Sequence, residues 1–277
     1  MLKRKPSSLP HLFVNGKLSS RRGEAGVSFS EGQIFAFESF RCYGRVIFCL
    51  REHLDRLFES ARTVGLELPK TRAQFEAELK KCLRADPPPD AFLRLAADER
   101  NTYVWVLERK RSAWAYQRGV SLKTSVVRRS SVHSTPPEPK TSSFLNPVLA
   151  HLETADSEGD ESILLDRSGY IAEGTTWNVF SVKSKVLYTP QSGILNGVTR
   201  QFVIKLAVAE DLPVFESNLS RHDFWNSDEA FLTNTSGEIV PIHSLDGRRI
   251  GREVPGPTTR LLMKRFQKEL RKELANA

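Results

Sequence analysis

The spacing of apolar and polar positions over the first part of the chain predicts a small α+β unit. Apolar residues recur at helical spacing over Glu52–Gly65 and again over Thr71–Arg84. The Asn15-Gly16 pair between two apolar stretches is typical of a tight hairpin turn. Further β-rich runs predict strands at Arg45–Leu50, Ala91–Ala97 and Thr102–Glu108.

The rest of the chain has the pattern of a second, larger α+β unit. It begins with a strand at Val120–Val127, and helices are expected at Leu145–Ala155, Val198–Ala209 and Thr258–Glu273. Shorter strand patterns lie between these helices, at Ile163–Asp166, Tyr170–Glu173, Asn178–Tyr188, Val214–Ser217 and Glu229–Thr233. We therefore expect a small domain at residues 1–111, a connector at 112–119 and a large domain at 120–277.

Composition narrows the class of protein. The chain is 39% hydrophobic and 27% charged, as in globular proteins. Its apolar runs fall far short of the roughly 20 residues needed to span a bilayer, and the basic N-terminus has no apolar segment behind it. Three cysteines without CxxC spacing favour reduced thiols over disulfides or a metal site. We expect a cytoplasmic protein that binds neither membrane nor metal.

The net charge of +8 raises the possibility of nucleic-acid binding. The basic residues are spread along the chain, however, and those near the C-terminus alternate with Glu269 and Glu273 along a predicted helix. No nucleic-acid-binding motif accompanies them. The charge therefore favours an anionic small molecule as the ligand, and we expect no nucleic-acid partner.

Two segments carry candidate chemistry. Ser130–Ser143 is the stretch richest in proline and serine, and Lys140 is its single lysine. Such a loop is either a linker or functional. Farther along, Leu195-Asn196-Gly197 leads directly into a predicted helix, so the N–H groups of Val198 and Thr199 are expected to point at an anion, with the Thr199 hydroxyl beside them.

Taken together, several separated segments resemble the fold-type IV pyridoxal-phosphate enzymes, the family of branched-chain and D-amino-acid aminotransferases and 4-amino-4-deoxychorismate lyases. The resemblance runs from about residue 12 to the C-terminus. The segments are EHLDRLF at Glu52–Phe58, PKTSSFLN at Pro139–Asn146, YIAEGTTWNVF at Tyr170–Phe180, GILNGVTR at Gly193–Arg200 and FLTNTSGEIVP at Phe231–Pro241.

The resemblance implies a role for each matching residue. Lys140 would form a Schiff base with pyridoxal 5'-phosphate and then move a proton between the substrate and the cofactor. Glu173 would keep the pyridine nitrogen protonated, Asn178 would orient the ring, and Leu195 would pack against one ring face. The alternatives are an ordinary loop lysine at 140 and a surface carboxylate at 173.

The phosphate would be held by a second set of residues. These are Val198 and Thr199 at the helix start, Arg56 from the small domain, and Thr235 from a turn. For Arg56, the alternative is a solvated residue that pairs with Glu52 at i, i+4. His53 is expected at the exposed start of its helix.

The chain also departs from the family pattern. In Ser28–Phe40 the glycine-rich part is replaced, although Phe37-Glu38-Ser39 is retained. Asp98-Glu99-Arg100 forms a tight turn where D-amino-acid enzymes carry a carboxylate-binding Arg-x-His, and Phe144 replaces a tyrosine of branched-chain enzymes. These changes leave the cofactor motifs intact and argue against a standard branched-chain or D-alanine aminotransferase.

The resemblance thus implies a two-domain α+β fold with the cofactor in the interdomain cleft, and a homodimer. The expected reaction is transfer of an amino group from an amino acid or amine to a 2-oxo acid. Two alternatives remain open: a lyase that eliminates pyruvate from 4-amino-4-deoxychorismate through the same lysine, and a non-catalytic relative.

Overall fold

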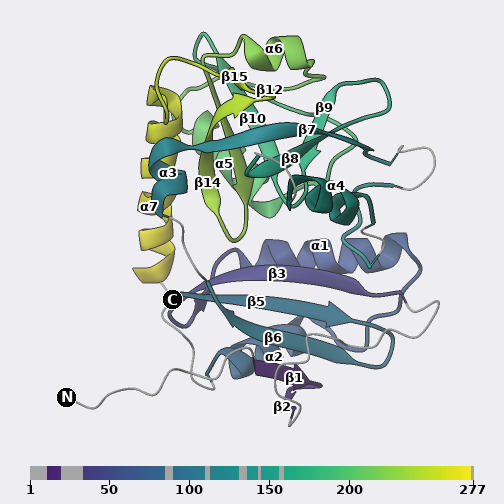
Figure 1. The fold of residues 1–277 in the computed structure, drawn as a ribbon. Coiled ribbons are helices and arrows are strands. Elements are labelled where there is room, and N and C mark those ends of the chain that lie inside the picture. The colour runs from purple at the N-terminus through teal and green to yellow at the C-terminus, as the bar shows by residue number, and fades with distance from the viewer. Residues whose placement is uncertain are drawn as a thin grey trace. The chain divides into compact units, whose positions relative to one another are not determined.

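The computed structural model describes residues 11–19, 34–84, 90–109, 113–130, 136–142, 145–155 and 159–275. The chain divides into two compact units (Figure 1): the described parts of Met1–Lys110 and Pro139–Ser143 form one, and those of Arg111–Glu138 and Phe144–Asn276 form the other. Lys140 therefore belongs to the first unit, and its expected place in the second domain is wrong. The reason is a strand-like bridge between Thr141 and Ala36, a non-local pairing that the local sequence pattern does not reveal.

The first unit is built on a six-stranded antiparallel sheet with the strand order β2-β1-β6-β5-β3-β4. The predicted hairpin is confirmed, because Asn15 and Gly16 join the first two strands with φ angles of 49° and 73°. The strands are β1 (His11–Val14), β2 (Lys17–Leu18), β3 (Ala36–Tyr43), β4 (Val46–Ile47), β5 (Asp90–Ala97) and β6 (Thr102–Glu108).

Two helices, α1 (Leu50–Thr63) and α2 (Arg72–Arg84), pack on one face of this sheet and confirm the predicted helical spacing. The expected strand at Arg45–Leu50 is wrong for its second half. Only Val46–Ile47 is a strand, because Cys49 adopts a left-handed conformation (φ 51°) and α1 begins at the next residue.

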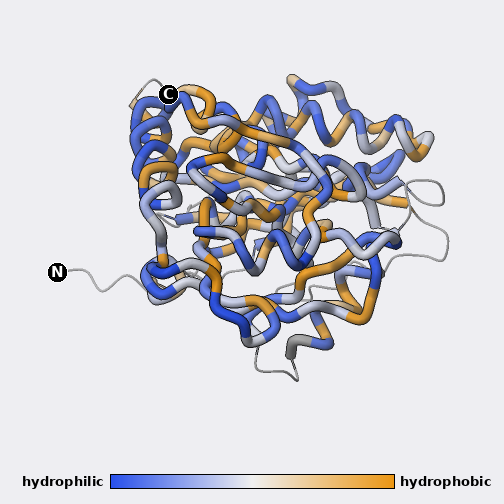
Figure 2. Tube along the Cα trace, turned by 90° about the horizontal axis from the view of Figure 1, so that it is seen from above, coloured by the Kyte–Doolittle hydropathy of each residue, from blue (hydrophilic) through white to orange (hydrophobic). Residues whose placement is uncertain are grey.

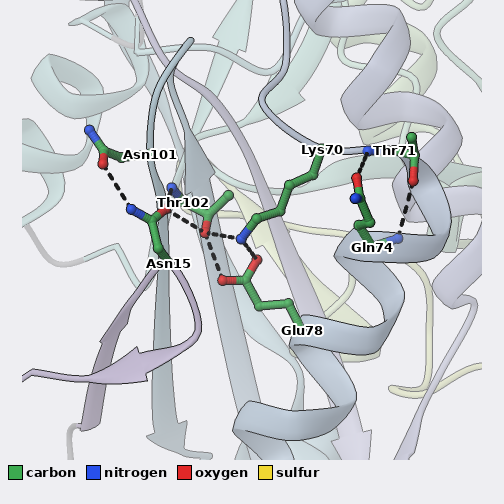
Figure 3. Close-up of polar contacts among 7 residues, drawn as sticks. All are labelled: Asn15, Lys70, Thr71, Gln74, Glu78, Asn101 and Thr102. Carbon is green, nitrogen blue, oxygen red and sulfur yellow. Dashed lines mark hydrogen bonds and ion pairs between the residues drawn. The ribbon is translucent and has the colours of Figure 1, made fainter.

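A polar network ties the first hairpin to α2 (Figure 3). Thr102 is fully buried and donates its hydroxyl to Glu78 at 2.7 Å. Lys70 donates to both residues, and Asn15 accepts from the Thr102 main chain at 2.8 Å. The buried carboxylate of Glu78 is thereby compensated by a charge and a hydroxyl, as burial of an ionised group requires.

The second unit is built on a nine-stranded mixed sheet with the order β12-β11-β10-β13-β14-β7-β8-β9, with β15 paired to β14. Because β9 also lies beside β10, the sheet curls around an apolar core. The strands are β7 (Val120–Arg128), β8 (Glu161–Leu165), β9 (Ile171–Gly174), β10 (Asn178–Lys183), β11 (Val186–Thr189), β12 (Val214–Glu216), β13 (Glu229–Asn234), β14 (Glu238–Leu245) and β15 (Arg248–Arg249).

Five helices accompany this sheet: α3 (Ala113–Arg118), α4 (Leu145–Ala155), α5 (Val198–Val208), α6 (Arg221–Trp225) and α7 (Pro257–Ala275). The sequence pattern predicted a connector at the segment of α3 and no helix at α6, because both helices are too short for a clear helical period. Hydrophilic and hydrophobic residues alternate along the chain in Figure 2, and in α7 the residues Leu262, Phe266 and Leu270 are buried one turn apart.

Within the described ranges, no helix is long and apolar enough to cross a membrane. The same residues contain no cluster of three or more His, Cys, Asp or Glu side chains that could hold a metal ion.

Candidate active site

Lys140 is held in the first unit by hydrogen bonds at both of its main-chain polar groups. Its N–H donates to the hydroxyl of Ser60 on α1 at 2.9 Å, and its carbonyl accepts from the N–H of Phe37 on β3 at 3.0 Å. Its Nζ lies 4.5 Å from the centre of the Phe37 ring, a cation–π contact. The main chain of Lys140 is therefore fixed in a way that an ordinary loop lysine is not.

Arg56 also belongs to the first unit, and its position excludes the alternative of a solvated residue. It is 9% exposed, and it makes a two-point ion pair with Glu38 on β3, from Nε at 2.6 Å and from Nη2 at 2.8 Å. A guanidinium has five N–H donors, so this contact uses only part of the set. These two bonds orient the guanidinium of Arg56.

Glu38 is the residue that sequence reasoning missed in this part of the site. Its carboxylate has no exposed surface, and it accepts hydrogen bonds from Arg56, from His53 Nδ1 at 2.9 Å and from the Ser39 N–H. Burial raises the pKa of Glu38, but the charge of Arg56 and the bonds from His53 and Arg56 more than offset it and hold the pKa well below its usual value. Glu38 is therefore ionised. The retained Phe37-Glu38-Ser39 sequence was the available signal.

His53 does not lie at an exposed helix start, so that expectation is wrong. It is 1% exposed, and its ring packs 5.2 Å from that of Phe40. Burial lowers the pKa of His53, although Glu38 acts in the opposite direction. His53 donates its Nδ1–H to Glu38, since an ionised carboxylate can only accept.

In the second unit, Glu173 near the end of β9 is 6% exposed, which excludes the alternative of a surface carboxylate. Its Oε2 accepts from the Leu195 N–H at 2.9 Å and from the Asn178 amide at 3.3 Å. Its other oxygen lies 2.7 Å from Nε of Arg129, a partner that the sequence did not suggest. A negative charge is thereby kept inside the unit by fixed donors.

Asn178 connects this carboxylate to the start of α5. Its amide nitrogen donates to the Leu195 carbonyl at 2.8 Å as well as to Glu173. Its Oδ1 lies against Gly197, where any Cβ would come within 2.0 Å of it. Gly197 is the N-cap of α5, so a glycine is required at this position for Asn178 to hold the segment that precedes the helix.

The first turn of α5 has the features expected of an anion site. No side chain caps it, and Val198 and Thr199 are 9% and 5% exposed. The first N–H groups of a helix have no partner within it and carry partial positive charge. By contrast, the N-terminus of α6 is closed by a capping box between Ser220 and Asp223.

Thr235 lies in the turn between β13 and β14, where it is half-buried. The preceding Asn234 shapes this turn by accepting from the Gly237 N–H at 2.6 Å and by donating to the Thr176 carbonyl at 3.2 Å. Residue 176 belongs to the β9–β10 connection, between Glu173 and Asn178. The turn that contains Thr235 is thus hydrogen-bonded to the β9–β10 connection, which lies between Glu173 and Asn178.

The structure therefore places the expected residues in two groups, each described within its own unit. Lys140 lies against α1 and β3, and Arg56 on α1 is paired with β3. Glu173, Asn178 and Leu195 are hydrogen-bonded to one another, next to the start of α5 with Val198 and Thr199. Thr235 is linked to them only through its neighbour Asn234, which bonds to the β9–β10 connection. Phe144 lies outside the described residues.

A further cation lies near Lys140 and was also missed from the sequence. Residues 37 and 39 of β3 pair with residues 96 and 94 of β5, so their side chains share the sheet face opposite to that of Glu38. On this face the exposed Arg94 lies 5.9 Å from the Phe37 ring, the ring that Lys140 also contacts. A charged residue within the apolar run Phe92–Ala97 was the signal.

Comparison with known proteins identifies the family. A family model described as amino-transferase class IV matches residues 36–245. The chain belongs to the class IV aminotransferases. A putative branched-chain-amino-acid aminotransferase of Methanocaldococcus jannaschii is 34% identical to it, with 92% of this chain and 95% of that protein covered. A D-alanine aminotransferase of Bacillus licheniformis is 29% identical, with 95% and 98% covered.

A solved structure of the same fold is similar over nearly the whole chain. It is the branched-chain amino acid aminotransferase of Escherichia coli, at a TM-score of 0.86 and 27% identity, with 93% of each chain covered. The two-domain fold-type IV architecture is thereby confirmed.

The cofactor of this family is present in another of the similar structures. A branched-chain amino acid aminotransferase solved with pyridoxamine 5'-phosphate has a TM-score of 0.84 and 26% identity, with 93% of each chain covered. The protein is a pyridoxal-phosphate-dependent aminotransferase. Its donor set fits that cofactor: a lysine with a fixed main chain, a buried carboxylate and a helix start without a side-chain cap.

Replacing Glu38 tests how the Arg56 group is held. We expect Glu38→Gln to lower the free energy of unfolding near pH 7 by about 3 kcal/mol, because it leaves the buried charge of Arg56 uncompensated. The folded-state pKa of Glu38 is depressed, so its contribution is present above the unfolded-state pKa near 4.5 and is lost as the pH falls below it. The difference between wild type and variant, measured by urea unfolding, should shrink from pH 5 to 3.

Glu76→Gln is the matched control, since Glu76 pairs with Lys80 on the exposed surface of α2 at 2.6 Å. It should change stability by less than about 1 kcal/mol. A difference between wild type and Glu38→Gln that does not vary with pH over this range would contradict the ionised, charge-compensated state of Glu38.

Proposed function

We propose that Lys140 is the residue that binds the aldehyde of pyridoxal phosphate and carries the proton during amino transfer. This proposal rests on the hydrogen bonds that Ser60 and Phe37 make to the main chain of Lys140. They hold the Cα of Lys140 in one place, although its side chain is flexible. When bound, the cofactor supplies the aldehyde carbon and an electron-withdrawing ring. Lys140 takes the proton from the substrate α-carbon and delivers it to the cofactor carbon.

The other residues hold the cofactor in this proposal. Glu173 keeps a proton on the ring nitrogen, supported by its fixed bonds to Asn178 and Leu195. The Leu195 side chain packs on the ring. The phosphate is bound by the N–H groups of Val198 and Thr199, the Thr199 hydroxyl, Arg56 and Thr235, supported by the uncapped start of α5 and by the orientation that Glu38 imposes on Arg56.

We propose amino acids with apolar side chains as donors, with their carboxylate bound by Arg94. The sheet face that carries Phe37 and Arg94 also carries Tyr103 and Trp105, whose rings are stacked 6.3 Å apart. One exposed guanidinium among aromatic rings suits a molecule with a carboxylate and an apolar body.

The β5–β6 turn favours branched-chain over D-alanine-type substrates. Asp98 closes this turn by accepting from the main chain of Arg100 and Asn101 at 2.7 and 2.6 Å, so no Arg-x-His pair stands there. The name of the Methanocaldococcus jannaschii relative points to the same substrates. The acceptor is a 2-oxo acid.

Removal of Lys140 tests the catalytic assignment. We expect Lys140→Ala to abolish the absorbance band at the visible–ultraviolet border and to lower kcat about 10³-fold or more, because the proton carrier is lost. Borohydride should fix the cofactor covalently to the peptide that contains Lys140 in the wild type alone. Lys123→Ala, on the exposed side of β7, is the control.

Retention of the band in Lys140→Ala would overturn the assignment. Pyruvate released from 4-amino-4-deoxychorismate without an amino acceptor, in excess of amino transfer, would instead identify the lyase reaction as the main activity.

Replacement of Arg94 tests the substrate class. We expect Arg94→Met to lower kcat/KM for apolar amino acids about 10- to 100-fold, the value of a hydrogen-bonded ion pair, and to leave kcat/KM nearly unchanged for an amine of the same side chain without the carboxylate. Arg100→Met, in the adjacent turn, should affect neither. Equal losses for both substrates would show that Arg94 does not bind the carboxylate.

We propose that the protein forms a homodimer through α4. Three large apolar side chains on this helix, Val148, Leu149 and Leu152, are 42–58% exposed, and Val126 on the adjacent β7 is 83% exposed. Such clustering is costly in water and is typical of an interface between subunits. Their spacing places Val148 and Leu152 one turn apart, as a self-complementary helix face requires.

Light scattering during size-exclusion chromatography tests the dimer. We expect Leu152→Glu to shift the protein to monomer, because burying a carboxylate in an apolar interface is unfavourable. Val208→Glu, at an equally exposed position on α5 (61%), should leave the dimer intact. A wild-type monomer at micromolar concentration, or a dimeric Leu152→Glu variant, would contradict this proposal.

A further inference from the structure

The segment that carries Lys140 joins the first unit as an added piece of strand along β3. Besides the bonds to Lys140 itself, Ser142 donates its N–H to the Phe35 carbonyl at 2.9 Å and accepts from the Phe35 N–H at 3.3 Å. These contacts fix the chain on the C-terminal side of Lys140, and the bond from Phe37 fixes the Lys140 carbonyl.

On the N-terminal side of Lys140, the Pro137 carbonyl accepts from Arg129 Nη2 at 3.0 Å, but the main chain there has few donors. Pro136, Pro137 and Pro139 have no N–H to donate. The N–H of Lys140 is therefore the first donor after Pro139, and its acceptor is the hydroxyl of Ser60 at 2.9 Å. Ser60 is 2% exposed, so water is a poor substitute for this bond.

Ser60 lies on the same face of α1 as Arg56. The two residues are four positions apart, which places them one turn apart on a helix. Arg56 is held by Glu38 and Lys140 is held by Phe37, and these partners are neighbours on β3. The positions of Lys140 and Arg56 relative to each other are therefore set by the same face of α1 and the same part of β3.

We infer that Ser60 is a positioning residue for the reaction: its hydroxyl anchors the main chain of Lys140 and thereby sets where the lysine amine lies relative to Arg56. The inference rests on the proposed role of Lys140. Ser60 itself is not proposed to touch the reacting atoms. It acts only through the position of the Lys140 Cα.

Amide hydrogen exchange and cofactor retention, measured on the full chain, test this inference. In the apoprotein, we expect the Lys140 amide to exchange about tenfold faster in Ser60→Ala, because it has lost its acceptor. In the holoenzyme, the dissociation constant of pyridoxal phosphate should rise about tenfold. Ser60→Thr keeps the hydroxyl and should restore both values. Ser60→Cys keeps the volume with a weaker acceptor and should fall between wild type and Ser60→Ala.

Thr63→Ala is the matched control, because the Thr63 hydroxyl is also on α1 and bonds only within the helix, to the Glu59 carbonyl at 2.9 Å. It should leave the Lys140 amide and cofactor binding unchanged. If Ser60→Ala or Ser60→Cys matches wild type in both measurements, the inference is overturned.

Failure of the proposed function has a different signature. If wild type forms no borohydride-fixable product at Lys140, the catalytic role of Lys140 is wrong. The exchange rate of the Lys140 amide in the apoprotein still reports whether Ser60 anchors the main chain.

Discussion

The burial of the Glu38 carboxylate is the constraint on which the first unit depends. A carboxylate with no exposed surface is tolerated only if charge and hydrogen bonds replace water, and Arg56 and His53 supply them from α1. This fixes α1 against β3 at the level where the Lys140 segment joins the same strand. The placement of the candidate lysine and of the candidate phosphate ligand thus follows from how one buried charge is compensated.

The second unit also contains a buried carboxylate that is compensated by hydrogen bonds and a positive charge. Glu173 is also buried, and its bonds to Leu195 and Asn178 join β9 to the chain that enters α5. In each unit, a buried carboxylate therefore organises the polar residues around it and keeps them in fixed orientations. Arg129 supplies the charge on one side, as Arg56 does for Glu38. Such fixed orientation is what binding of a cofactor at several points requires.

The β3 strand presents two different sets of residues, because successive side chains of a strand point to opposite faces. Glu38 faces α1 and holds Arg56, whereas Phe37 faces the side that carries Arg94, Tyr103 and Trp105. Under the proposed function, substitutions on the second face would change substrate preference without disturbing the buried ion pair. This accounts for a chain that keeps the cofactor motifs of its family and departs from the family elsewhere.

The sequence by itself determined the features that depend on local pattern: the helices at α1, α5 and α7, the Asn15-Gly16 turn and, through motif order, the family and its cofactor. It did not reveal that Lys140 joins the first unit or that His53 is buried. It also did not reveal that Glu38 pairs with Arg56 and Arg129 with Glu173. These features arise from pairings between residues far apart in the chain, such as Thr141 with Ala36. Only the tertiary structure decides such contacts. The local periodicity of a sequence predicts which face of a helix or strand is buried, but it does not predict which other element packs against that face.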